Sequence, residues 1–246
     1  MRPRTRLLFV LCLALMAGLA GRAQTVLPTP LRIYAFANNL NDSQGGPALT
    51  AGGGTVGNGV YTFSANPGLT YTDTAFDPAN YTIELSFSFQ TLNSWKKIID
   101  LANLGADAGL YSYNGKLQFY SPAISTSTDF TVNTSVDIVL TRDSSTQLVT
   151  GYVNGISVLS FTDSGNIAVA GTAGSPVIFF TDDHNTSQNE ASAGAVNWIR
   201  LYNQPLSSTE VLALFQAGAP TAVPEPSTYG LLAAGLALLS FVRRRR

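Results

Sequence analysis

One short acidic segment of the chain has the residue types that bind hard metal ions. It contains Asp182, Asp183, Asn185, Asn189 and Glu190. Calcium takes about six to eight oxygen ligands, some of them loop carbonyls. The segment therefore predicts a Ca²⁺ site in which Asp182, Asp183 and Glu190 are the side-chain ligands. The spacing differs from that of an EF-hand, and a solvated acidic loop is the alternative interpretation.

Four aromatic residues could form a sugar-binding platform. They are Trp95, Tyr111, Tyr113 and Tyr120. Sugar-binding proteins use exposed aromatic faces beside amides and carboxylates, and aromatic rings contribute large contact areas. Trp95 falls in the connection 91–96, where it is expected to be accessible, so it is the candidate ligand-binding residue. Aromatic residues at alternating strand positions can equally be part of the core.

The sequence contains few residues in patterns that are suited to catalysis. Glycosidases need two carboxylates that flank the scissile bond, but Glu84, Glu190 and Glu210 are far apart in the sequence and each is expected to be isolated. The single histidine, His184, lies in a polar loop, and the chain has no Gly-x-Ser-x-Gly motif. The sequence therefore favours a non-catalytic protein, with a carbohydrate-active enzyme as the alternative.

Charge is distributed unevenly along the chain. The net charge is −1, but residues 24–220 hold six basic and fourteen acidic residues, which gives 6 − 14 = −8. Four arginines lie in residues 1–23 and four more end the chain. Because the acidic body has no basic stripe to displace counterions, nucleic acid is excluded as its partner. The lone Cys12 excludes disulfides and cysteine metal sites.

The N-terminal residues 1–23 have the pattern of a secretory signal peptide. Arg2, Arg4 and Arg6 precede an apolar run over residues 7–20. The run is too short for a membrane span, and small residues follow it. We expect signal peptidase to cleave between Ala23 and Gln24, and residues 24–30 to form a linker.

The C-terminal residues predict a second targeting segment. Residues 219–226 form a linker whose prolines keep the backbone extended. Residues 227–242 are almost wholly apolar and would span about 24 Å as a helix. The terminal arginines should stay in the cytoplasm, so residues 227–246 are expected to be a transmembrane helix with an arginine cluster. The motif residues are Val223, Pro224, Glu225, Pro226, Arg243, Arg244, Arg245 and Arg246.

This order of residues resembles the PEP-CTERM sorting signal. The resemblance implies processing by an exosortase near Pro-Glu-Pro in a Gram-negative bacterium, typically one that makes exopolysaccharide. The protein would be held transiently at the inner membrane by its C-terminal helix, and then reach the cell surface or the extracellular space.

Residues 31–218 are expected to form an all-β sandwich. Residues 81–89 alternate between apolar and polar side chains, which indicates a strand with one buried face. Asn114-Gly115 and Asn154-Gly155 predict two-residue hairpin turns. A short helix should begin after Ser207, with Glu210 as its capping-box partner. Further strands are expected at residues 31–37, 60–64, 97–102, 108–113, 116–120, 136–141, 147–153, 156–161, 176–181 and 196–202.

The body is similar to the laminin-G-like, concanavalin A-like jelly-roll modules. The similarity rests on three segments, residues 141–143, 151–155 and 199–211, and on the strand at 81–89. Asn197-Trp198 stands where such modules often have an acidic residue near a calcium site. The resemblance implies an exported, non-catalytic, lectin-like module that binds polysaccharide or a surface partner. A glycoside hydrolase and a calcium-dependent adhesion module are the alternatives.

Overall fold

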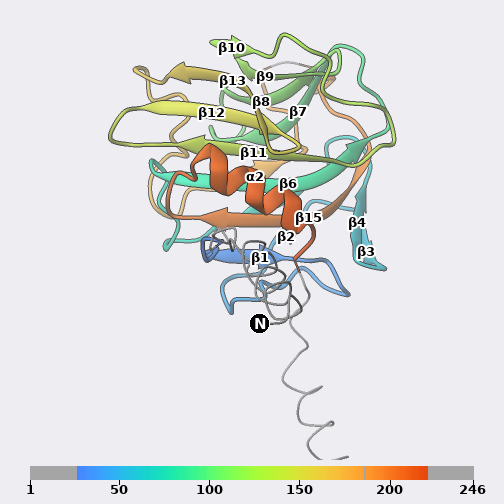
Figure 1. Ribbon diagram of the computed structural model, residues 1–246. Helices are drawn as coiled ribbons and strands as arrows, with labels where there is room; N and C mark the ends of the chain where they lie inside the picture. Colours follow the sequence, from blue (N-terminus) through green and yellow to red (C-terminus); the bar gives the residue numbers. More distant parts are fainter. Residues whose placement is uncertain (1–26, 186, 221–246) are drawn as a thin grey trace, which may run out of the picture.

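Two antiparallel sheets stack face to face in the computed structural model, which describes residues 27–185 and 187–220 (Figure 1). The first sheet has the order β13 (Ile156–Thr162), β12 (Leu148–Val153), β11 (Val136–Arg142), β6 (Tyr81–Phe89), β15 (Gly194–Tyr202), β4 (Val60–Phe63), β3 (Thr55–Gly57), with β1 (Arg32–Tyr34) also paired to β15. The second has the order β10 (Ala123–Ile124), β9 (Lys116–Tyr120), β8 (Gly109–Tyr113), β7 (Trp95–Asp100), β14 (Val177–Phe179), β5 (Leu69–Tyr71), β2 (Thr50–Ala51). The predicted all-β sandwich is confirmed.

The main core lies between the two sheets. Alternate residues of the central strand β6, including Ile83, Leu85 and Phe87, are completely buried there, as are Leu110 and Phe119 of the second sheet. Burying such apolar area contributes about 25 cal/mol per Å², which is the main force that holds the layers together.

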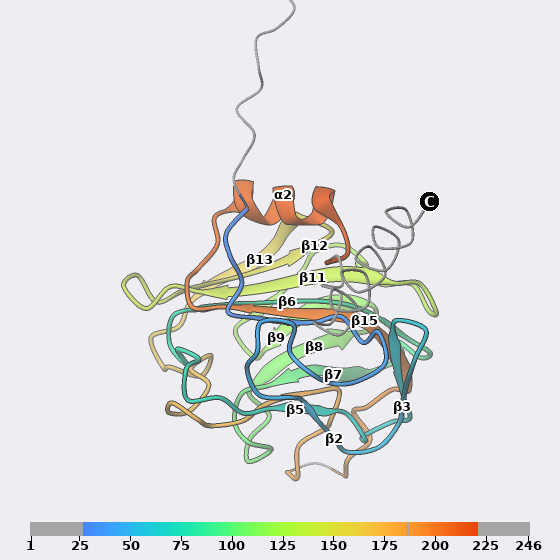
Figure 2. The same ribbon diagram turned by 90° about the horizontal axis from the view of Figure 1, so that it is seen from below.

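A helix covers the outer face of the first sheet. This helix, α2 (Ser208–Ala217), lies on the side of the first sheet that faces away from the second (Figure 2). Its contacts form a second apolar cluster, which comprises Val139, Tyr152, Tyr202, Leu206, Val211 and Leu214. The prediction that β6 has only one buried face is therefore wrong: Thr82, Glu84 and Ser86 on its other face are also buried.

The turn and cap predictions are confirmed. Asn114 and Gly115 have φ values of 49° and 81°, and Asn154 and Gly155 have 49° and 80°, as tight hairpins require. The side chain of Ser207 accepts a hydrogen bond from the amide of Glu210, and the Glu210 side chain accepts from the Ser207 amide, which makes a full capping box.

Several predictions concern residues outside the described part of the chain. These are the signal peptide with its cleavage between Ala23 and Gln24, the motif at 223–226, and the transmembrane helix and arginine cluster at 227–246. Among the described residues, no helix is both long and apolar enough to cross a membrane.

Candidate binding site

A small hollow opens on the outer face of the second sheet. It has a volume of about 110 Å³ and is lined by Trp95, Asp107, Tyr111, Tyr120 and Glu190. Trp95 begins β7, Tyr111 lies in β8 and Tyr120 ends β9. Asp107 precedes β8, and Glu190 lies in the connection from β14 to β15. The hollow therefore joins three neighbouring strands to a distant loop.

Strand register brings the aromatic residues together. Leu110 and Phe119 pair across β8 and β9 and point into the core. Because side chains alternate along a strand, Tyr111 and Tyr120 point outward. Trp95 is paired with Tyr113 in the ladder.

The Trp95 ring lies at the centre of an aromatic cluster. Its centroid is 4.2 Å from that of Tyr113, 5.2 Å from Tyr120 and 5.5 Å from Tyr111. Trp95 is half-buried and begins β7, so its predicted place in a connection is wrong. The four aromatic residues that the sequence suggested as a platform do lie together, and the role of Trp95 in binding stays a prediction.

A buried ion-pair network lies beneath these aromatic rings. Lys97 is fully buried, and its Nζ is 3.1 Å from Asp183 Oδ2 and 3.3 Å from Asp100 Oδ2. The same Nζ lies 4.3 Å from the centroid of the Tyr111 ring. The Tyr111 hydroxyl donates to Asp183 Oδ2 at 3.3 Å. These contacts hold Tyr111 rigidly against the second sheet.

Asp182 fixes the loop that carries Glu190. Its carboxylate accepts hydrogen bonds from the amide of Glu190 at 2.9 Å and from the amide of Asp183 at 3.0 Å. The Lys97 amide donates to the Glu190 carbonyl at 2.7 Å. Glu190 is thereby tied to β7 at the rim of the hollow.

These contacts correct the interpretation of the acidic segment as a solvated loop. Asp182 and Asp183 are completely buried, and Asp183 is an ion-pair partner of Lys97. Among the described residues, no three His, Cys, Asp or Glu side chains are grouped so as to hold a metal ion. The Ca²⁺ site of Asp182, Asp183 and Glu190 thus stays a prediction without supporting geometry. His184 is exposed, as expected.

The carboxyl groups of the hollow hold protons more tightly than usual. Burial raises the pKa of Glu190, and so does the negative charge of Asp182, Asp107 and Asp183. Burial and the neighbouring Asp183 raise the pKa of Asp107. Burial by itself would raise the pKa of Asp183, but hydrogen bonds from Asn185, Asp107 and Lys97 lower it. The site is an acidic, partly dehydrated hollow.

Sequence reasoning missed two members of the site. Asp107 lies in an irregular turn with no recognisable motif, and Lys97 resembles any lysine in a strand. Glu190 was expected to be isolated, which is wrong because it lines the same hollow as Asp107. Only the three-dimensional pairing of the strands brings these residues together.

Glu84 is not isolated either. It is buried under α2, where Arg200 Nη1 lies 3.1 Å from both of its carboxylate oxygens. Burial raises the pKa of Glu84 to about 7, although the charge of Arg200 opposes this shift. Arg200 also donates to the carbonyl of Gly218, just after α2. The Glu84–Arg200 pair is enclosed by protein and has a structural role.

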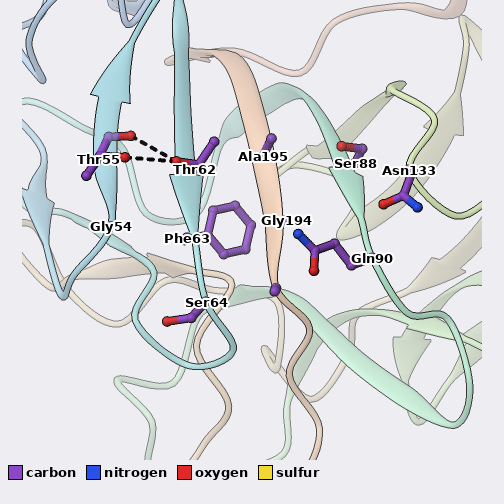
Figure 3. Close-up of a pocket in the computed structure, with 11 residues that line it drawn as sticks. Gly54, Thr55, Thr62, Phe63, Ser64, Ser88, Gln90, Asn133, Gly194 and Ala195 are labelled. Carbon is purple, nitrogen blue, oxygen red and sulfur yellow. Dashed lines mark hydrogen bonds between the residues drawn. The ribbon is translucent and has the colours of Figure 1, made fainter.

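A second, wider hollow lies at the end of the first sheet (Figure 3). It measures about 510 Å³ and has the hydroxyl and amide groups of Thr55, Thr62, Ser88, Gln90 and Asn133 in its wall. Its lining includes no ionisable side chain, and its one aromatic residue, Phe63, is only 4% exposed and stacks on core Phe180. It therefore lacks an exposed ring for stacking.

Comparison with protein families finds a match for the β-sandwich body and another for the C-terminal segment. Residues 63–212, more than half of the chain, match the model of the concanavalin A-like lectin/glucanases superfamily. The chain belongs to this superfamily. Residues 222–246 match the PEP-CTERM protein-sorting motif. In the comparison with curated proteins, nothing matches this concanavalin A-like chain.

Solved structures share the fold of this concanavalin A-like protein. Trypanosoma rangeli sialidase matches with a TM-score of 0.60 at 18% identity, over 80% of this chain and 34% of that one. Domain 4 of the arabinanase AbnA from Geobacillus stearothermophilus, solved with arabinotriose, matches with 0.53 at 16% identity, over 76% of this chain and 98% of that domain. The receptor-binding domain of botulinum neurotoxin type G matches with 0.52 at 13% identity, over 77% and 51%. This chain spans about a third of the sialidase, and these likenesses establish the fold alone.

Proposed function

We propose that this protein is an exported, non-catalytic glycan-binding module that uses the aromatic hollow on its second sheet. One observation supports this most strongly: Trp95 and Tyr120 form an accessible aromatic surface beside the carboxyl groups of Asp107 and Glu190. Aromatic rings supply stacking area, and carboxylate oxygens accept hydrogen bonds from sugar hydroxyl groups. Sugar binding needs this combination. AbnA domain 4, which has the same fold, was solved with arabinotriose.

The position of the hollow suits a protein that is tethered and then released. The two ends of the described body, Leu27 and Pro220, line one groove beside Leu214 of α2. The groove therefore lies beside α2, on the outer side of the first sheet. The strands that carry the hollow, β7, β8 and β9, belong to the second sheet, on the other side of the sandwich (Figure 2). A body attached through its C-terminal segment would present the hollow away from the membrane.

The sorting motif supports export and transient membrane anchoring, with processing by an exosortase. The final location at the cell surface or outside a Gram-negative cell, and a polysaccharide partner there, belong to the proposal.

A direct binding experiment tests the proposal. The full-length protein and its Trp95→Ala variant are applied to a glycan array and to exopolysaccharide from the source strain. We expect glycan binding that falls at least about tenfold in the variant, because one stacking ring is worth roughly 1–2 kcal/mol. Thr62→Ala, in the wider hollow, is the matched control and should bind normally. A blank array and no capture of exopolysaccharide would refute the proposal.

A glycoside hydrolase is the second candidate, because Glu190 and Asp107 line the same hollow and both have raised pKa values. A glycosidase needs such a carboxyl pair, with one member protonated. Release of reducing sugar from a broad glycan panel, abolished in Glu190→Gln, would favour this candidate over the non-catalytic one. Binding without any release favours the lectin-like role.

Calcium-dependent adhesion is the remaining hypothesis from the sequence. A cation bound only by the folded state must raise the melting temperature. Addition of Ca²⁺ or EDTA should leave the melting temperature unchanged if Asp182, Asp183 and Glu190 serve only the ion-pair network and the hollow. A rise with Ca²⁺ that is lost in Glu190→Gln would restore the metal site.

A further inference from the structure

The hollow has the features of a site for a positively charged group. Three aromatic rings, those of Trp95, Tyr111 and Tyr120, line it together with two carboxyl groups. Aromatic faces attract cations through the negative charge above and below the ring, and desolvation strengthens this attraction. Lys97 already makes such a contact within the protein, with its Nζ 4.3 Å from the Tyr111 ring centroid.

The surroundings carry an excess of negative charge. Among the residues that the structure describes, five carboxyl groups and two lysines interact around the hollow and its floor. They are Asp100, Asp107, Asp182, Asp183 and Glu190, with Lys96 and Lys97. With every group ionised the sum is 2 − 5 = −3, and a proton shared between Asp107 and Asp183 reduces it to −2. Lys97 lies 3.1 Å from Asp183 and 3.3 Å from Asp100, so its charge is already matched. Asp107 and Glu190 are the carboxyl groups that line the hollow itself.

Asp107 has an unused acceptor in this place. Its Oδ1 atom is buried and has no hydrogen-bond partner among the residues that the structure describes. A buried acceptor without a partner is unfavourable, so a donor supplied by a ligand would relieve that cost. An ammonium group can donate three hydrogen bonds. Its positive charge would also offset the negative charge around Asp107 and Glu190.

The volume limits what can enter. About 110 Å³ holds roughly three or four water molecules at about 30 Å³ each. A substituent such as an amino group fits, whereas the sugar ring that bears it would remain outside. Tyr120, 38% exposed, and the half-buried Trp95 are placed to contact that ring.

We infer that the hollow selects glycans that carry free amino groups, such as glucosamine units, over neutral, N-acetylated or acidic ones. This inference rests on the proposed glycan-binding function and specifies its ligand class. The ammonium group would lie between the aromatic rings and the carboxylates of Asp107 and Glu190. Uronic and sialic acids would be repelled by those carboxylates.

The test uses two oligosaccharides that differ only in acetylation. A β-1,4-linked glucosamine tetrasaccharide and its fully N-acetylated form are titrated into the full-length protein. We expect the free amine form to bind about tenfold more tightly, and the preference to shrink as salt screens the charges. Asp107→Asn and Glu190→Gln should each reduce the preference, and Asp77→Asn, at an exposed turn, should keep it.

The outcomes separate this inference from the proposed function. Equal affinity for both forms, or preference for the acetylated one, with binding that still requires Trp95, would overturn the amine preference and leave the glycan-binding role standing. Tighter binding of a lysine-rich peptide than of the glucosamine oligomer would also overturn it, in favour of a protein ligand. Binding of no glycan at all would remove the proposed function itself.

Discussion

Lys97 Nζ lies 3.1 Å from Asp183 Oδ2 beneath the aromatic hollow, and both side chains are completely shielded from solvent. The pair links β7 to the loop after β14, two segments that are remote in sequence. It supports Tyr111 on one side and the loop that carries Glu190 on the other. The hollow therefore depends on a structural ion pair that no ligand needs to touch.

Removal of Lys97 is expected to destabilise the whole body. Lys97→Ala leaves Asp183 and Asp100 buried without their cation, which typically costs about 3–5 kcal/mol. Urea unfolding followed by tryptophan fluorescence measures the loss. Lys116→Ala, at a strand end that is only partly buried, serves as the control and should change stability by less than about 0.5 kcal/mol. Similar unfolding midpoints for the two variants would contradict the role assigned to the pair.

Arg142 is expected to be as important for stability as Lys97, at another corner of the sandwich. Its guanidinium donates to Asp163 at 2.9 Å, to the Ala79 carbonyl at 2.6 Å and to Asn166 at 3.0 Å. Arg142→Ala therefore removes three contacts and leaves Asp163 buried, so we expect a loss of about 3 kcal/mol or more.

Arg142→Lys keeps the charge but not the forked geometry, so it should recover only part of that loss. Equilibrium unfolding of the two variants gives the comparison. If the lysine variant were as stable as the unaltered protein, the charge alone would account for the contact.

The Glu84–Arg200 pair predicts how stability changes with pH. Burial raises the pKa of Glu84 to about 7 and that of Asp137 to about 6. A carboxyl group whose pKa is higher in the folded than in the unfolded state stabilises the fold at low pH, and this stabilisation is lost as the pH rises through the folded value. The melting temperature should therefore fall between about pH 5 and pH 8.

Glu84→Gln is the matched control for this pH dependence. Glutamine cannot ionise, so the decline should become shallower, although Asp137, Asp100 and Glu190 contribute in the same direction. Each kcal/mol corresponds to about 2–4 °C in a protein of this size. An equally steep decline in the unaltered protein and in Glu84→Gln would contradict a raised pKa of Glu84 in the folded state.

The sorting motif makes a prediction about processing. Replacement of Pro224, Glu225 and Pro226 by alanine should leave an unprocessed product in the membrane fraction, because the matched motif includes these residues. Replacement of Pro28 and Pro30, outside the motif, should have no such effect. Fractionation and immunoblotting of whole cells measure both. Normal maturation of the first variant would contradict exosortase processing at this motif.

Much of the fold could be predicted from local sequence. The β6 alternation and the two Asn-Gly turns gave strand limits that match β6 and β9 fully. The short strands β2, β3, β5 and β10, of two or three residues each, were missed because so short a run has no detectable period.

The site was harder to predict, for a physical reason. The sequence predicts an aromatic platform of Trp95 and three tyrosines. Their proximity follows because the strands that carry them are neighbours in sequence as well as in space. Asp107, Lys97 and the burial of Asp183 depend on the loop after β14 folding back against β7. Such long-range contacts leave no periodic trace in the sequence.

The most direct measurement is a titration of the best glycan from the array into the purified protein and into Trp95→Ala and Tyr120→Ala. Tyr120 is 38% exposed, so its loss should leave the fold intact. We predict that both variants bind at least about tenfold more weakly with unchanged melting temperatures, and that Thr62→Ala binds normally. Full affinity in both aromatic variants, with affinity lost in Thr62→Ala, would place binding in the wider hollow and contradict this account.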